Sequence, residues 1–292
     1  MRRFAQIWSV SAVLLLALFP TAAPGLAQPL LWQARDGDST VYLFGTMHAL
    51  RPGVVWESHQ VAEALSRSDS LWLETEAGQG GGADLIREHG LSVSGRLSAA
   101  LAPEQVAALA GLSRRLGVDF DRVDQMRPWL AAVTLTAAAM RQSGFTRAGA
   151  DVSLAREAAF HAIAVAGLDP AEFPIELFAE LPPAAEMAML VSASSDLASA
   201  HPSYLRLFEA WLAGDENGLV QHGIEPMRAS DPILYDRAIA ARNRAWAVKL
   251  ESLFLGRGVH FVAVGSLHLV GPDSLRVLLA AKGYRVEPVR SF

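Results

Sequence analysis

The chain has 292 residues, 51% of them hydrophobic, which is enough to bury a core in one large domain or two small ones. Its net charge of −5, with basic residues scattered among acidic ones, excludes the clustered positive surface that nucleic-acid binding requires. The absence of cysteine excludes disulfides, thiolate metal sites and cysteine nucleophiles.

The first 27 residues have the three parts of a secretory signal peptide. A basic start, "MRRF", precedes an apolar run from Ile7 to Phe19, and Gly25-Leu26-Ala27 offers a small-residue cleavage site. The apolar run is shorter than the roughly 20 residues that a membrane-spanning helix needs. We therefore expect residues 1–27 to be removed and the mature protein to be periplasmic or secreted, with no stable membrane anchor.

The next segment predicts a β-hairpin, a helix and a third strand. Two β-rich runs in "LLWQARDGDSTVYLFGTMH" are joined through a strong turn signal, Asp36-Gly37-Asp38, and the second run leads through Gly45 to His48. Helical spacing follows in "ESHQVAEALSRS". The apolar run "SLWLETE" then ends in Glu74 and Glu76, two acids that alternation places on one face of the strand.

The middle of the chain is largely helical. Apolar residues recur at helical spacing between residues 98 and 143, where Pro103 and Pro128 suit first-turn positions, and "DVSLAREAAFHA" predicts a further helix. "AIAVAGLDP" has the form of a buried central strand that ends at Asp169 before Pro170. A second helical block occupies residues 182–255.

The last segment predicts a strand, a helix and a final strand. "VHFVAVG" ends at Gly265, three residues before His268, and "PDSLRVLLAAKG" and "YRVEPV" follow. We expect a mixed α/β (α+β) fold, with a central mixed sheet built from both ends of the chain and covered by helices from the middle. No boundary signal divides residues 28–292, so we expect a single domain with helical insertions at about 98–160 and 182–255.

Two Gly-x-x-His motifs end apolar strands, at Gly45 and His48 and again at Gly265 and His268. A glycine at a strand end permits an unusual turn and a close approach, and the next side chains emerge at the rim of the sheet, where α/β folds bind ligands. A histidine there can be a metal ligand or a general base. Both roles require carboxylates nearby, and Glu74 is the best candidate.

Other polar residues are weaker candidates for the same site. Glu76 follows Glu74, and Asp169 ends a strand in the same way, although an acid before Pro170 can simply cap the next helix. Arg242 and Asn243 on the long helix could hold a carboxylate or an oxyanion. On the residues alone, a solvated helix face is the better interpretation of that pair.

Taken together, these segments resemble the bacterial TraB/GumN family, which is related to the Tiki proteins and more distantly to the erythromycin esterases. The resemblance is carried by "YLFGTMHALRPG", "LWLETE", "GADVSLAREAAFHAIAVAGLD", "LYDRAIAARNRAWA" and "FVAVGSLHLVGPDSLRVLLAAKGYRVE". One departure is Asp169, which stands where the family's pattern has a longer glutamate. Residue by residue, the resemblance implies a site of Gly45, His48, Glu74, Arg242, Asn243, Gly265 and His268.

The resemblance implies hydrolysis, in two forms. The Tiki branch implies a peptidase that depends on a divalent metal ion, with Mn or Co plausible, and histidine and carboxylate ligands also suit Zn. The leading hypothesis is therefore an exported metallopeptidase with His48, Glu74 and His268 as ligands and a peptide or other small substrate. The alternatives are a metal-free esterase with a histidine general base, and a protein that binds a peptide or glycan without cleaving it.

Overall fold

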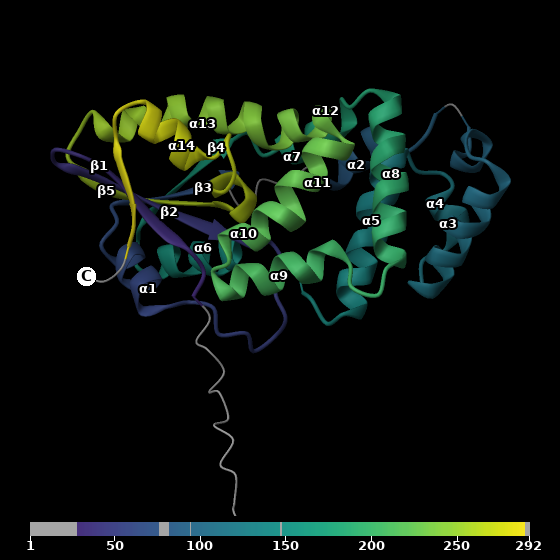
Figure 1. The fold of residues 1–292 in the computed structure, drawn as a ribbon, viewed down its shortest axis with the longest axis horizontal. Coiled ribbons are helices and arrows are strands. Elements are labelled where there is room, and N and C mark those ends of the chain that lie inside the picture. Colours follow the sequence, from purple (N-terminus) through teal and green to yellow (C-terminus); the bar gives the residue numbers. More distant parts are fainter. Residues whose placement is uncertain (1–27, 76–81, 94, 147, 290–292) are drawn as a thin grey trace, which may run out of the picture.

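The computed structural model describes residues 28–75, 82–93, 95–146 and 148–289 (Figure 1). The predicted signal peptide and Glu76 lie outside the described residues. Within the described part of the chain, no helix is long and apolar enough to cross a membrane.

A six-stranded mixed sheet forms the centre of the molecule, in the order β4-β3-β5-β2-β1-β6. β1 pairs with β2 and with β6 in antiparallel fashion, whereas β2, β5, β3 and β4 run parallel to one another. The predicted α/β fold, with strands from both ends of the chain, is therefore confirmed. The strands are β1 (Leu31–Asp36), β2 (Ser39–Thr46), β3 (Ser70–Thr75), β4 (Ala164–Asp169), β5 (Gly258–Gly265) and β6 (Arg285–Pro288).

The strand that follows the predicted hairpin turn lies directly beside the strand near the C-terminus. β1 and β2 close at the pair Asp36 and Ser39, as the turn signal predicts. β2 then pairs in parallel with β5, and Thr46 lies opposite Gly265. Because parallel strands end at the same edge of a sheet, this register brings the two Gly-x-x-His motifs to one place.

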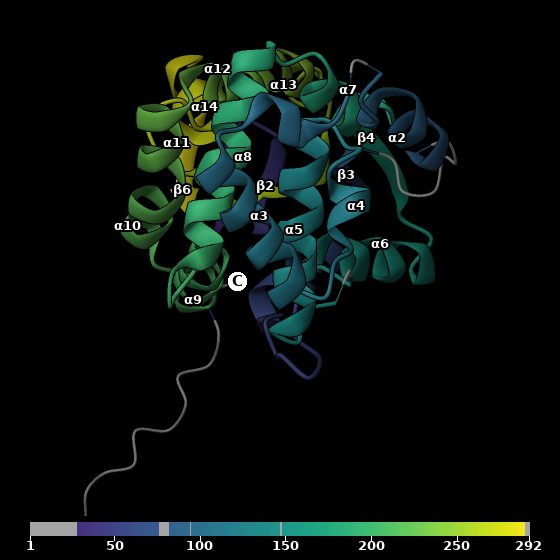
Figure 2. The same cartoon turned by 90° about the vertical axis from the view of Figure 1, so that its right-hand side faces the viewer.

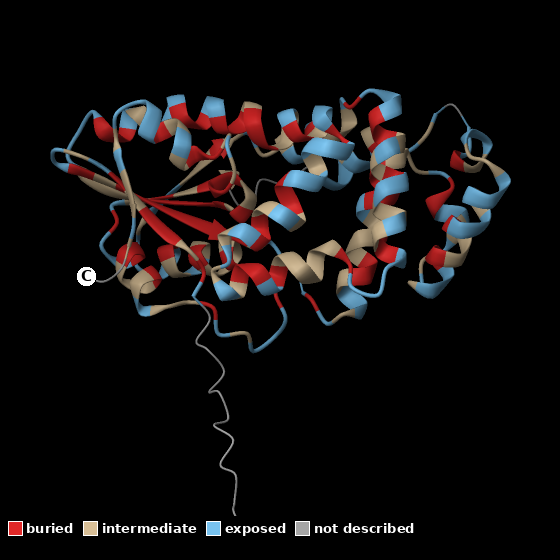
Figure 3. Ribbon diagram, in the orientation of Figure 1, coloured by how far each residue is buried: buried red, intermediate tan, exposed pale blue. Residues whose placement is uncertain are grey.

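Alternating side chains of the sheet enter two separate cores, and the central strands are coloured largely as buried in Figure 3. Phe44 and Phe261 pack with α1, α6 and α9 on one face. Leu43 and Val262, one position along each strand, pack with α13 and α14 on the other face. This alternation of period two buries both faces of the central strands and fixes which way each rim residue points.

Helices supply both covering layers and a part that extends beyond the strand ends (Figures 1 and 2). In that part α3, α5 and α8 share a core of their own. The helices are α1 (His59–Ser66), α2 (Gly82–Gly90), α3 (Pro103–Arg115), α4 (Phe120–Val123), α5 (Pro128–Gln142), α6 (Ala150–Phe160), α7 (Phe173–Ala179), α8 (Pro183–Ala198), α9 (Ser203–Ala213), α10 (Glu216–Leu219), α11 (Glu225–Ser230), α12 (Pro232–Tyr235), α13 (Ala241–Glu251) and α14 (Leu275–Ala281).

The helical segments expected at about 98–160 and 182–255 contain α3 to α6 and α8 to α13. Pro103 and Pro128 begin α3 and α5, as predicted. The second segment is tied to the sheet by Trp211 of α9, whose indole N–H donates to the carbonyl of Gly45 at 2.7 Å. The second helical segment is thus anchored through α9 at the strand end that leads to His48.

One strand differs from its predicted environment. "AIAVAGLDP" was expected to be a buried central strand, but β4 lies at the edge of the sheet, and Ala164 and Val165 are exposed. β4 is as apolar in sequence as a central strand. Leu168, near its end, packs in the core with residues of α13. A short apolar run does not reveal whether a second neighbour follows it in the sheet.

Candidate functional site

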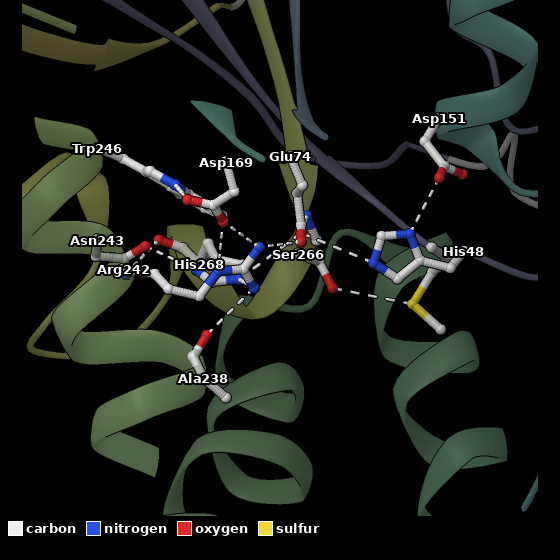
Figure 4. Close-up of polar contacts among 12 residues, drawn as sticks. His48, Glu74, Asp151, Asp169, Ala238, Arg242, Asn243, Trp246, Ser266 and His268 are labelled. Carbon is white, nitrogen blue, oxygen red and sulfur yellow. Dashed lines mark hydrogen bonds and ion pairs between the residues drawn. The ribbon is translucent and has the colours of Figure 1, made fainter. Parts of the chain in front are cut away.

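His48 lies just beyond β2, at the rim where the parallel strands end (Figure 4). Its side chain is 60% exposed, and its Nδ1–H donates to Oδ2 of Asp151 at 3.1 Å. This hydrogen bond raises the pKa of His48 to about 9, with further support from the charges of Glu74 and Asp151 against the effect of burial. The imidazole is therefore cationic at neutral pH, with Nε2 directed toward Glu74.

Glu74 is the residue at which the site converges. Its Oε1 accepts a hydrogen bond from the N–H of Gly265 at 2.7 Å, and its Oε2 accepts one from Nη2 of Arg242 at 2.7 Å. Burial alone would raise the pKa of this carboxyl, but the neighbouring imidazoles, the guanidinium and the Gly265 N–H outweigh burial and lower the pKa to about 2. Glu74 is thus a largely enclosed carboxylate, 17% exposed, that stays ionised.

His268 lies in the 3₁₀ turn Ser266–Leu269 after β5, and its side chain is only 5% exposed. Asn243 donates its amide N–H groups to the carbonyls of His268 and Asp273, at 3.2 and 2.8 Å, so its Oδ1 faces Nδ1 of His268 at 2.7 Å. Nδ1 must therefore carry the proton, because Oδ1 can only accept. Burial lowers the pKa of His268 to about 3, so the ring is neutral and Nε2 carries a lone pair that can accept a hydrogen bond.

Arg242 joins the buried groups to one another. Its Nε donates to Asp169 at 2.9 Å, and its Nη1 donates to Nε2 of His268 at 3.2 Å, in addition to the Nη2 bond to Glu74. The guanidinium carbon lies 4.3 Å from the ring centre of Trp246. A π-helical segment, Asp236–Ala240, immediately precedes α13 and this arginine, and such segments are frequent at functional sites.

The interpretation of this helix as a solvated face is therefore wrong for Arg242 and Asn243, which are both buried. The following residue, Arg244, does lie at the surface and pairs with Asp236. Positively charged residues are usually solvated unless they are paired, and the sequence alone does not reveal that the partners are Glu74 and Asp169, in strands far from it in the chain.

Asp169 holds the arginine and does not face the cavity. Its Oδ2 accepts from Arg242, and its Oδ1 accepts from the indole N–H of Trp246 at 2.7 Å. A shorter acid is thus sufficient at this position, because α13 packs close to the end of β4. In this geometry Asp169 fixes the direction of the guanidinium.

The two motif glycines are needed for close approach. A Cβ on Gly265 would lie 3.0 Å from Oε1 of Glu74 and 3.5 Å from Nε2 of His48, and a Cβ on Gly45 would lie 3.0 Å from the Cα of Ser266. Neither glycine has a positive φ, so the unusual turn that we expected is absent. Side-chain volume, rather than backbone conformation, is what these positions exclude.

Asp151 is the site residue that the sequence did not single out. It lies in the first turn of α6, which approaches the backbone after β2 so closely that a Cβ on Gly149 would be 2.5 Å from the carbonyl of Met47. The signal was present in "GAD", a glycine and an acid at the start of a predicted helix. An acid in a first turn is, however, already explained by the helix dipole.

A cavity of about 570 Å³ opens beside these residues. His48, Glu74 and Asp151 line it together with Thr46 and one face of α6, whereas Arg242 and His268 lie behind Glu74 and are not part of its wall. Cavities of this size are typical of ligand sites. A molecule in the cavity would therefore contact His48 and Glu74 directly, but not Arg242 or His268.

The donor atoms partly fit a divalent metal ion. Nε2 of His48 and Nε2 of His268 each lie 3.7 Å from Oε1 of Glu74, and each ring has its other nitrogen held by a polar partner, as is usual for metal-binding histidines. Among the described residues, however, no group of three or more acidic or histidine side chains converges as an ion site. The contact from Arg242 already uses the lone pair of His268.

A family model described as the TraB/PrgY/gumN family matches residues 30–288, so the chain belongs to that family. No curated protein and no solved structure matches the chain.

Replacement of Asp151 by Asn should lower the pKa of His48 from about 9 toward its ordinary value of 6.5, because the main cause of the increase is the bond to the carboxylate. A raised folded-state pKa adds stability that is complete below pH 6.5 and is lost as the pH rises through about 9. NMR titration of the His48 ring would measure the change. An unchanged titration in Asp151→Asn, relative to an Asp84→Asn control on the exposed part of α2, would contradict this assignment.

Replacement of Arg242 by Met should destabilise the fold by about 3–5 kcal/mol, because it leaves the buried carboxylates of Glu74 and Asp169 without a cation. Urea unfolding would measure this free energy. The matched control is Arg244→Met, two residues along the same helix, whose exposed pair with Asp236 should contribute less than about 1 kcal/mol. Equal losses of unfolding free energy in the two variants would contradict this prediction, because the Arg242 contacts would then stabilise the fold no more than a surface ion pair.

Proposed function

We propose that this member of the TraB/PrgY/gumN family is a hydrolase whose substrate is a peptide or another small carbonyl compound. The observation that supports it most is the set of protonation states around Glu74: an ionised carboxylate between a cationic imidazole, a cationic guanidinium and a neutral imidazole. Such sets occur where acid–base chemistry is carried out, because environment separates the pKa values of neighbouring groups.

In the metal-dependent form, which the family resemblance favours, His48, Glu74 and His268 would hold a divalent ion. Mn, Co or Zn suits imidazole and carboxylate donors. When bound, such an ion lowers the pKa of a water molecule and polarises a carbonyl group. Asp151 and Asn243 would fix the two rings through their Nδ1 atoms, and Arg242 would stabilise negative charge that develops on the substrate.

The metal-free form has its own support in the contact of Arg242 with Nε2 of His268. Here His48 would act alone at the cavity, and Asp151, rather than Glu74, would orient its ring. The pKa of His48 is about 9, and only its neutral form can accept a proton from water. Below pH 9, the fraction of neutral His48 rises about tenfold for each unit by which the pH is raised. Turnover by this route should therefore rise with pH up to about 9.

Peptide and ester libraries incubated with the purified protein would test the proposal. We expect turnover that is lost on treatment with a chelator and restored by Mn²⁺, Co²⁺ or Zn²⁺. His48→Ala should lower kcat by about 10²–10⁴-fold, whereas His59→Ala, on the exposed face of α1, should leave it unchanged. Turnover that survives chelation would select the metal-free form. Binding without turnover under every condition would show a binding protein and end the hydrolase proposal.

We also propose that the protein is exported to the periplasm or secreted, on the sequence of residues 1–27 alone. The N-terminus of the exported protein should be Gln28. A mature chain that still begins at Met1 would contradict cleavage.

A further inference from the structure

One face of α6 forms a wall of the cavity beside His48. Asp151, Val152, Ala155, Arg156 and Ala159 line the cavity, at successive spacings of one and three residues that place them on one side of the helix. A helix rises 1.5 Å per residue, so the backbone of Arg156 lies about 7.5 Å farther along the axis of α6 than that of Asp151. The wall therefore leads from the reactive groups to an arginine.

Arg156 has no acidic partner within the described part of the chain. It is exposed, and no hydrogen bond or ion pair of its guanidinium is found there. Among the described residues that line the cavity, it is also the only lysine or arginine. The neighbouring acids have partners of their own: Asp151 binds His48, and Glu157 lies 3.7 Å from His161. With no partner among the described residues, this guanidinium in the cavity wall is available to a ligand.

Most of the other residues that line the cavity are apolar. They are Leu73, Val152, Ala155, Ala159, Pro174 and Ala263, and the polar Thr75 lines it as well. The buried Oγ1 of Thr46 and Oδ1 of Asp151 find no hydrogen-bond partner among the described residues. Both atoms have almost no accessible surface, so Arg156 and the apolar lining, rather than these oxygens, are what a ligand in the cavity would contact.

We propose that the cavity binds a short peptide by its C-terminal residue, with Arg156 pairing with the terminal carboxylate. An apolar C-terminal side chain matches the wall of α6. Arginine binds carboxylates through two parallel hydrogen bonds. A phosphate, with its greater negative charge, is less suitable because Glu74 and Asp151 line the same cavity.

This inference rests on the proposed function, because it assumes that hydrolysis takes place beside His48 and Glu74. An extended residue spans about 3.3–3.6 Å, so a carboxylate held by Arg156 places one of the last peptide bonds beside His48 and Glu74. There the oxygen of water bonds to the carbonyl carbon, the C–N bond breaks, and both protons of water pass to the leaving nitrogen, which becomes an ammonium group. The products are a shortened peptide with a new carboxylate and a free amino acid or dipeptide.

Two probes separate recognition from cleavage: N-acetyl-Ala-Ala-Leu with a free carboxylate, and the same peptide with a C-terminal amide. Calorimetry with the purified protein should show that the acid binds at least about tenfold more tightly than the amide, because a hydrogen bond to a charged group contributes roughly 1.5–3 kcal/mol. Arg156→Gln should remove this preference and leave binding of the amide unchanged. Arg156→Lys should keep part of it, and Arg114→Gln, an exposed change on α3, should keep all of it.

The outcomes distinguish the two proposals. Acid-selective binding that disappears in Arg156→Gln supports the inference even if neither probe is cleaved, in which case the hydrolase proposal fails alone. Cleavage of both probes at equal rates, with equal affinity, overturns the inference and leaves the hydrolase proposal standing. Acid preference that persists in Arg156→Gln overturns the role of Arg156. Failure of the acid to bind at millimolar concentration also overturns the inference.

Discussion

The parallel pairing of β2 with β5 is the constraint on which the site depends. The two strands come from opposite ends of the chain, and their register places Thr46 beside Gly265. Because side chains alternate across a sheet, a slip of one residue would turn the rim side chains of one strand to the opposite face. The cores on the two faces prevent that slip, since it would move residues such as Phe44 and Leu43 into the wrong layers.

The two Gly-x-x-His motifs are similar in sequence and different in physical state. His48 is exposed, cationic and held by a carboxylate, whereas His268 is buried, neutral and held by an amide. Each partner comes from a helix in the middle of the chain, Asp151 from α6 and Asn243 from α13. The chemical difference between the two histidines is therefore produced by the helices and not by the motifs.

Local pattern was sufficient to predict the hairpin, the strand ends and the sheet built from both ends of the chain. The turn at Asp36, the helix starts at Pro103 and Pro128 and the strand that leads to Glu74 all follow from neighbouring residues. What pattern could not predict depends on distant neighbours. β4 is an edge strand because nothing pairs with its outer side in the sheet order, and short apolar runs do not carry that information.

The same limit applies to the candidate site. The structure brings His48, Glu74, Arg242, Asn243 and His268 together, while their roles in catalysis remain predictions. Asp151 was missed because an acid at a helix start has an ordinary explanation. Arg242 was assigned to solvent on the residues alone because its two carboxylate partners arrive from β3 and β4. In each case the decisive contact joins residues that are more than 70 positions apart in the chain.

The π-helical segment Asp236–Ala240 determines the angle at which α13 presents its side chains. Tyr235, before the segment, donates to Oδ2 of Asp273, and Asn243, after it, donates to the carbonyl of the same residue. A π-bulge is equivalent to one residue inserted into an α-helix, and each residue of an α-helix turns the chain by about 100°. Loss of that residue would leave a regular helix but would rotate Arg242 away from Glu74. The orientation of this arginine can therefore be reset by a change of one residue in helix length, with no change to the sheet.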